Sequence, residues 1–213
     1  RSLTSPTASP AWFSRALADL RGLLVRGEVY QARQLSNHIG QVLEAMFTDE
    51  TEEVSAQLAR HFEEAGVPEK AVAYRLQAGT KALRMSAHRE AIFHLNGGLE
   101  RLADLPSGPE RTQLELGLQN ALGVASLATF GYASSQVQQA YTRARELAQA
   151  LGDPTREVAV LYGLCVFRFV RGELNQAYEE GQQLYDLARQ SGQIGYALGS
   201  LLVLGAIALN LGK

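Results

Sequence analysis

The stretch from Val160 to Ser191, VLYGLCVFRFVRGELNQAYEEGQQLYDLARQS, has the pattern of one complete helix-turn-helix unit. In its first half, Leu161, Leu164 and Cys165 recur at the i, i+3, i+4 spacing of one helix face. Gly172 then predicts the end of this first helix, because glycine commonly terminates helices. A second helix is expected to follow, with an inward stripe made of Leu174, Ala177, Tyr178, Gly181, Leu184, Tyr185 and Ala188.

Small residues recur at equivalent places elsewhere in the chain. A glycine or serine, four residues and then an alanine occur as GVPEKA (66–71), SAHREA (86–91) and GELNQA (172–177). The first residue suits a turn, and the alanine suits the close contact of two antiparallel helices. Leu, Ala, Gln, Glu and Arg dominate the composition while β-branched residues are sparse, which favours helices over sheets. We therefore predict an all-α protein, a superhelical solenoid of antiparallel helix hairpins.

The sequence divides into three predicted parts. Residues 1–10 are expected to form a disordered start, because they are polar and rich in proline. Residues 11–50 are expected to form an N-terminal helical pair, and residues 51–213 a helical repeat array that is truncated at its C-terminal end.

The truncation is inferred from the last predicted helix. The spacing of Leu204 and Gly205 from Gly212 repeats that of Leu164 and Cys165 from Gly172, so the last helix would open an unfinished repeat. Terminal repeats normally carry a polar outer face, whereas this one is apolar. An exposed apolar end is therefore expected, which favours a homodimer through the exposed repeat ends.

Charge, cysteine content and hydropathy restrict the partners and the compartment. The chain of 213 residues has a net charge of -2, which gives no electrostatic reason to expect nucleic acid or an anionic membrane as partner. Its single cysteine, Cys165, cannot form an internal disulfide, so a cytoplasmic location is expected. The apolar run 197–211 is shorter than the roughly 20 residues that span a bilayer, and it is interpreted as a buried repeat helix.

No catalytic, metal or cofactor site is predicted, so the protein is expected not to be an enzyme. His88 and His94 are six residues apart, on nearly opposite sides of a helix, whereas two ligands on one face need a spacing of three or four. His61 and Glu64 can meet on one face and are interpreted as a solvated pair. Other charged residues interpreted as parts of solvated helix faces are Arg143, Arg145, Glu146, Glu179 and Glu180.

A partner-binding groove is the more specific functional hypothesis for this sequence. In stacked hairpins the first helix of each pair lines the inner surface, and the residues on its free side face a ligand. Apolar residues there suit an apolar or amphipathic peptide segment. The residues predicted to line this groove are Tyr162, Val166, Phe169, Leu202, Ala206 and Leu209. The competing interpretation is that they pack against a missing continuation of the array or against a superhelical neighbour.

These positions resemble a known repeat family. The residues that resemble the tetratricopeptide signature are Leu58, Ala59, Phe62, Gly66, Ala71, Ala78, Leu164, Cys165, Gly172 and Ala177. Longer phrases are similar to the C-terminal helical-repeat region of large bacterial signalling ATPases, which often carry an adenylate or guanylate cyclase domain. These phrases are AQLARHFEEAGVPEKAVAYRLQAGTKALRMSAHREAIFHLNGGLERL (56–102), LATFGYASSQVQQAYTRARELAQALGDP (127–154) and FVRGELNQAYEEGQQLYDLARQSG (169–192).

The resemblance covers about residues 35–213 and implies a sensor or partner-binding arm. The chain has no GxxxxGK[ST] phosphate loop and no candidate cyclase metal carboxylates, so neither activity carries over to it. We expect a protein-interaction or regulatory arm of a larger bacterial signalling protein that binds a protein or peptide. The alternatives are an effector-sensing domain of a transcriptional regulator, which a closed polar pocket would favour, and an oligomerisation module.

Overall fold

A computed structural model of the protein describes residues 9–132 and 134–212. This part of the chain forms ten α-helices and one short 3-10 helix, without a β-strand. The all-α prediction is therefore confirmed. The helices are α1 (Pro10–Val25), α2 (Val29–Met46), α3 (Ser55–Ala65), α4 (Pro68–Arg84), α5 (His88–Arg101), η1 (Leu102–Asp104), α6 (Pro109–Phe130), α7 (Ser135–Leu151), α8 (Pro154–Val170), α9 (Leu174–Gln190) and α10 (Ile194–Leu211).

The predicted disordered start, 1–10, falls mostly on residues 1–8, which lie outside the described residues. Pro10 already belongs to α1, where its missing N–H is tolerated at the first helical position. The Ser9 hydroxyl caps this helix by accepting a hydrogen bond from the backbone N–H of Trp12 at 3.3 Å. The N-terminal pair expected within 11–50 corresponds to α1 and α2.

The three turns singled out in the sequence share one backbone conformation. Gly66 has φ +73°, Gly172 has φ +78° and Ser86, at the equivalent place, has φ +57°. All three lie in the left-handed region, which glycine adopts without the steric cost that a Cβ brings. The three turns that the sequence pattern relates to one another therefore also share the same backbone conformation.

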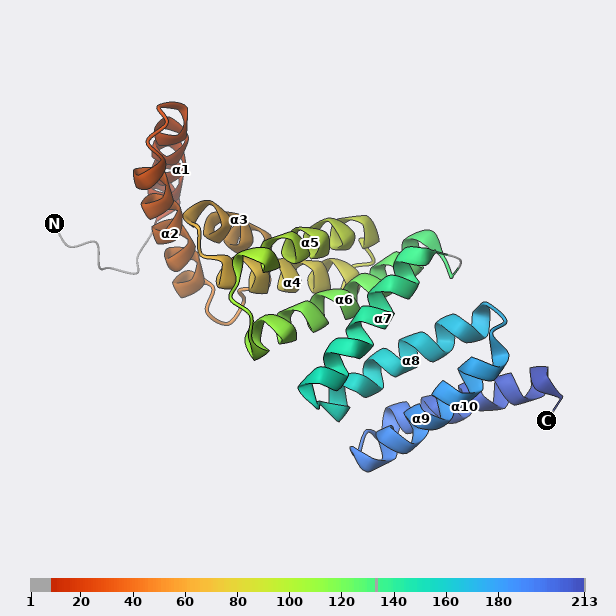
Figure 1. The fold of residues 1–213 in the computed structure, drawn as a ribbon. Coiled ribbons are helices and arrows are strands. Elements are labelled where there is room, and N and C mark those ends of the chain that lie inside the picture. The colour runs from red at the N-terminus through yellow and green to blue at the C-terminus, as the bar shows by residue number, and fades with distance from the viewer. Residues whose placement is uncertain (1–8, 133, 213) are drawn as a thin grey trace.

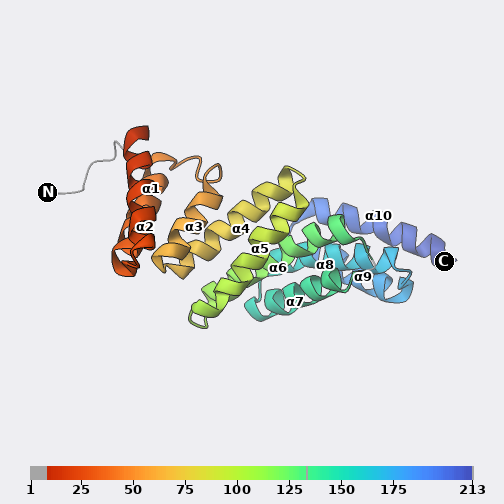
Figure 2. The same cartoon turned by 90° about the horizontal axis from the view of Figure 1, so that it is seen from above.

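The helices pack in the order in which they occur along the chain. Each helix contacts the next one, and contacts between second neighbours join α4 to α6, α6 to α8 and α8 to α10. The even-numbered helices from α4 to α10 therefore form one row, with α5, α7 and α9 beside it. Figures 1 and 2 show an elongated arrangement with α1 and α10 at opposite ends.

The small residues lie inside the packed layers. Ala91, Ala140 and Ala177 are at most 2% exposed, as expected for alanines at close helix contacts. Cys165 is also buried, and its Sγ donates a hydrogen bond to the backbone carbonyl oxygen of Ala177 at 3.3 Å. Burial raises the pKa of the Cys165 thiol to about 12, so the thiol stays protonated at neutral pH.

The interpretation of Glu180 as part of a solvated helix face is wrong. Its side chain is buried, and its Oε1 and Oε2 form ion pairs with Nη1 of Arg145 at 3.2 Å and Nε of Arg168 at 3.0 Å. The neighbouring Glu179 is exposed, as expected. Because these three residues come from α9, α7 and α8, the carboxylate joins three consecutive helices.

The interpretation of His61 and Glu64 as a solvated pair is also wrong. The His61 side chain is buried, and its Nδ1 lies 3.9 Å from Oε2 of Glu64. That carboxylate oxygen instead accepts a hydrogen bond from the Ser36 hydroxyl at 2.8 Å, because α3 packs on α2. Burial lowers the pKa of His61, although the Glu64 charge opposes this effect.

This lowered pKa predicts a loss of stability in acid. The unfolded chain binds a proton at His61 more readily than the folded protein does, so the free energy of unfolding is expected to decrease as the pH falls below about 6.5. His61→Gln is expected to weaken this dependence, measured by chemical denaturation between neutral pH and mildly acidic pH. His38→Gln is the control, and an unchanged pH dependence in His61→Gln would contradict the prediction.

Candidate functional site

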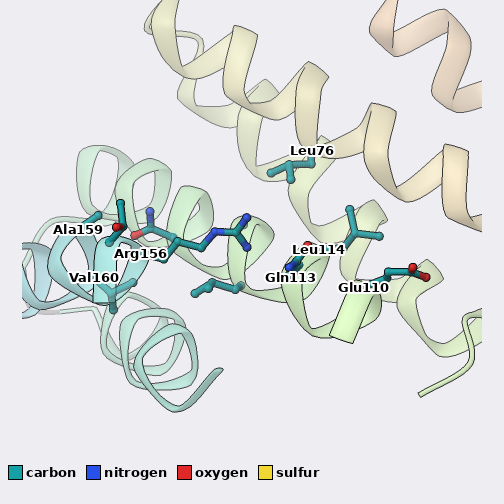
Figure 3. Close-up of a pocket in the computed structure, with 11 residues that line it drawn as sticks. Leu76, Glu110, Gln113, Leu114, Arg156, Ala159 and Val160 are labelled. Atoms are coloured by element: carbon teal, nitrogen blue, oxygen red, sulfur yellow. The ribbon is translucent and has the colours of Figure 1, made fainter. Parts of the chain in front are cut away.

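An open groove of about 540 Å³ lies where α4, α6 and α8 meet (Figure 3). Its lining combines apolar and polar side chains from these three helices. The apolar part consists of Leu76, Leu114, Leu116, Gly117, Ala159 and Val160. The polar part consists of Glu110, Gln113, Asn120, Thr155 and Arg156.

The groove exists because α6 lies close to α4 but not to α8. A Cβ at Gly117 would lie 2.8 Å from Cδ2 of Leu76, so the glycine permits the close approach of α4 and α6. By contrast, α6 and α8 share few direct contacts, and α7 packs on both of them. The space left between α6 and α8 opens toward solvent.

Core residues form the floor of the groove. Leu116 from α6 and Val160 from α8 are at most 2% exposed, and they share a hydrophobic cluster with Leu164 and Phe167. The floor is therefore apolar and held in place by the packing of both helices.

The first turn of α8 places Arg156 at the rim. The Asp153 side chain caps this helix, accepting hydrogen bonds from the backbone N–H groups of Thr155 and Arg156 at 3.0 and 3.1 Å. The other carboxylate oxygen of Asp153 pairs with Nε of Arg156 at 3.1 Å. The guanidinium extends from α8 toward α6, as Figure 3 shows. Its Nη atoms thus remain available for an anionic group.

Three further rim residues come from α6. Glu110 lies in the first turn of this helix, and Gln113 and Asn120 follow on the same side. Their side chains form no hydrogen bond or ion pair with any other described residue. A side-chain amide can donate and accept hydrogen bonds at once, as a peptide group does. The rim thus offers two free amides between a carboxylate and a guanidinium.

This arrangement suits the binding of a peptide segment. The apolar floor can take an aliphatic side chain, the amides can pair with peptide groups, and the two charges can fix the direction of the bound chain. Sequence reasoning missed these residues. No local signal in the sequence places the first turns of α6 and α8 opposite each other.

The residues predicted from sequence to line a groove lie outside this one. Tyr162 is half-buried between α8 and α10, with its ring 5.7 Å from that of Tyr196 in an edge-on contact. Phe169 packs against the cluster that contains Ile207, and Val166 is half-buried. These three share one helical row with Ala159, which does line the groove.

The other three predicted residues lie on α10. Leu202 and Leu209 are among the most exposed apolar side chains, and Ala206 is half-buried. α10, which contains the run 197–211, is long and apolar enough to cross a membrane. Only 17% of this helix is buried in the protein, so its interpretation as a buried helix is wrong.

No family model matches this chain, and no curated protein matches it. Among solved structures, the crystal structure of BtubC (BKLC) from P. vanneervenii is similar, with a TM-score of 0.62 and 15% sequence identity. The match covers 98% of this chain and 85% of that chain. At this identity the similarity concerns the fold alone.

Proposed function

We propose that this chain is a non-catalytic interaction arm, a tetratricopeptide-like solenoid that binds a peptide segment of a partner protein between α4, α6 and α8. The observation that carries the proposal is the open groove, with its buried apolar floor and its rim of unpaired amides and opposite charges. The sequential packing of the helices and the repeated small residues support the solenoid. The resemblance of residues 35–213 to the helical-repeat region of bacterial signalling ATPases supports the proposal that the arm belongs to a larger bacterial signalling protein.

The groove suggests the chemistry of the bound segment. An aliphatic side chain would occupy the floor at Leu116 and Val160, with an acidic residue beside Arg156 and a basic residue beside Glu110. An effector-sensing regulator would need an enclosed pocket, whereas this groove is open. Its openness therefore favours a peptide over a small effector.

A bulky side chain in the groove is expected to block binding. Ala159→Trp places an indole in the space between α8 and α6 without altering the buried floor. Linear peptides selected by display on the full chain are expected to bind this variant at least about tenfold more weakly, by calorimetry, which corresponds to about 1.4 kcal/mol. The thermal midpoint is expected to stay close to that of the unmodified protein.

The matched control is Ala150→Trp, at an exposed position on α7 outside the groove. It is expected to bind the selected peptides as the unmodified chain does. A second variant, Arg156→Glu, should change the selected peptides from acidic to basic at one position. Recovery of no binding peptide, or equal binding by Ala159→Trp, would show that the groove is not the interaction site.

A further inference from the structure

A second groove lies on the opposite side of α6, between α5 and α7. Both of these helices pack on α6, but they make few direct contacts with each other. The space left between them has a volume of about 370 Å³, and we call it the α5–α7 groove. On α6, Gly117 and Asn120 line the first groove whereas Leu122 and Ser126 line this one, so the two grooves use opposite faces of one helix.

Uncharged polar side chains from all three helices line the α5–α7 groove. They are four amides and one hydroxyl, belonging to Asn96, Gln119, Gln136, Gln139 and Ser126. None of these five side chains forms a hydrogen bond with another described residue. The apolar part of the lining consists of Ile92, Leu99, Leu122 and Phe130.

The charged residue in this lining is already neutralised. Nε of Arg143 lies 2.6 Å from Oε1 of Glu115, and its Nη1 lies 3.2 Å from Oε2 of Glu146. A phosphate or carboxylate would therefore meet two carboxylates beside one guanidinium, and they would repel it. The α5–α7 groove suits an uncharged ligand.

Ser126 is the residue that points most directly to a ligand. It is only 2% exposed, yet its hydroxyl forms no hydrogen bond with another described residue. Other hydroxyls inside the helices bond to a carbonyl oxygen one turn earlier, as Thr129 does to Ala125 at 2.9 Å and Thr80 to Leu76 at 2.8 Å. Because a buried polar group costs stability unless it is hydrogen-bonded, a bound ligand would supply the partner that Ser126 lacks.

The two neighbouring gaps of the same kind are bridged by arginine side chains. Between α3 and α5, Arg75 of α4 joins Glu63 at 2.6 Å to His94 at 3.1 Å. Between α7 and α9, Arg145 pairs with Glu180 at 3.2 Å. Within the described part of the chain, no hydrogen bond or ion pair joins α5 to α7. The α5–α7 groove is therefore the gap among these three that lacks a bridge.

We propose that the α5–α7 groove binds a neutral sugar, whose hydroxyl groups pair with the free amides and with Ser126. Each sugar hydroxyl donates and accepts hydrogen bonds, as a side-chain amide does, so the two sets of groups match. Phe130 is 51% exposed and offers an aromatic face on which a sugar ring can pack. A nucleobase fits less well, because Phe130 is the single aromatic side chain among the described lining residues and would stack on one face only.

This site does not depend on the proposed peptide groove, since no described residue lines both. Saturation-transfer difference NMR of the full chain with a panel of neutral hexoses, pentoses and their disaccharides tests the proposal. At least one sugar of the panel is expected to bind. The phosphorylated form of the same sugar is expected to bind at least about tenfold more weakly, because the groove has no unpaired cation.

Two variants locate the bound sugar. Ser126→Ala and Gln139→Ala are each expected to weaken binding about three- to tenfold, the loss of one hydrogen bond. In the free protein, Ser126→Ala should not lower the thermal midpoint, because it removes a buried hydroxyl that has no partner. Gln138→Ala is the matched control on α7, exposed and outside the groove, and it should bind as the unmodified chain does. Ala159→Trp, in the peptide groove, should also keep sugar binding.

Four results would overturn the proposal. They are the absence of binding by every sugar of the panel, tighter binding of the phosphorylated form, and equal weakening by Gln138→Ala and Gln139→Ala. The fourth is a lower thermal midpoint of Ser126→Ala without ligand, which would show that this hydroxyl already has a partner inside the protein.

Discussion

Gly163→Ala is expected to lower the free energy of unfolding by about 2 kcal/mol, because the added methyl group has no room. A Cβ at this position of α8 would lie 2.6 Å from Cε1 of Tyr141, a buried ring of α7. The ring cannot retreat freely, since it also packs closely against Gly123 of α6, where an added Cβ would lie 2.8 Å from the same ring atom. Overpacking costs up to about 3 kcal/mol, and the higher helix propensity of alanine offsets up to about 1 kcal/mol.

The control for this variant is Gly97→Ala, another glycine inside a helix. Its Cβ would lie 3.4 Å from the nearest atoms of Arg75, an ordinary van der Waals distance. Stability is therefore expected to increase by about 0.5 to 1 kcal/mol, the difference in helix propensity. Combining Gly163→Ala with Tyr141→Leu should restore part of the loss. Urea denaturation of the four proteins checks the signs, and equal effects at both glycines would contradict the close packing around Tyr141.

Glu180→Ala is expected to cost about 3 kcal/mol, near the lower end of the range for breaking a buried ion pair. The variant leaves the guanidiniums of Arg145 and Arg168 without the carboxylate that joins them. The loss is limited because each arginine keeps another partner. Arg145 retains Gln183 at 2.9 Å, and Arg168 retains Glu173 at 2.9 Å.

Glu179→Ala is the matched control, because the adjacent side chain is exposed. It is expected to change stability by less than about 0.5 kcal/mol, as at most surface sites. Replacing Glu180, Arg145 and Arg168 together by apolar residues of similar size should recover much of the loss. Chemical denaturation at neutral pH measures all three proteins. A loss in Glu179→Ala as large as that in Glu180→Ala would mean that the ion pairs are not its cause.

The sequence by itself determined the positions of the helices and of several turns. Helix periodicity and left-handed turn residues are local signals, so the turns at Gly66 and Gly172 could be placed without knowing what packs on them. The burial of Ala91, Ala140 and Ala177 was also predictable. Each of these alanines lies on the apolar face of its helix, where a short side chain suits close contact with a neighbouring helix.

Only the tertiary structure decided which helix faces meet across the layers. Glu180 and Glu179 are adjacent in sequence, yet one is buried and the other exposed, because the rotation of α9 against α7 and α8 depends on side chains far away in the chain. The groove has the same origin. It opens because the absence of a side chain at Gly117 lets α6 lie close to α4. The ring of Tyr141 in α7 fills the space beside Gly123 of α6 and Gly163 of α8, which lets α7 pack closely on both helices. Such contacts depend on the summed shapes of three helices, which no local pattern encodes.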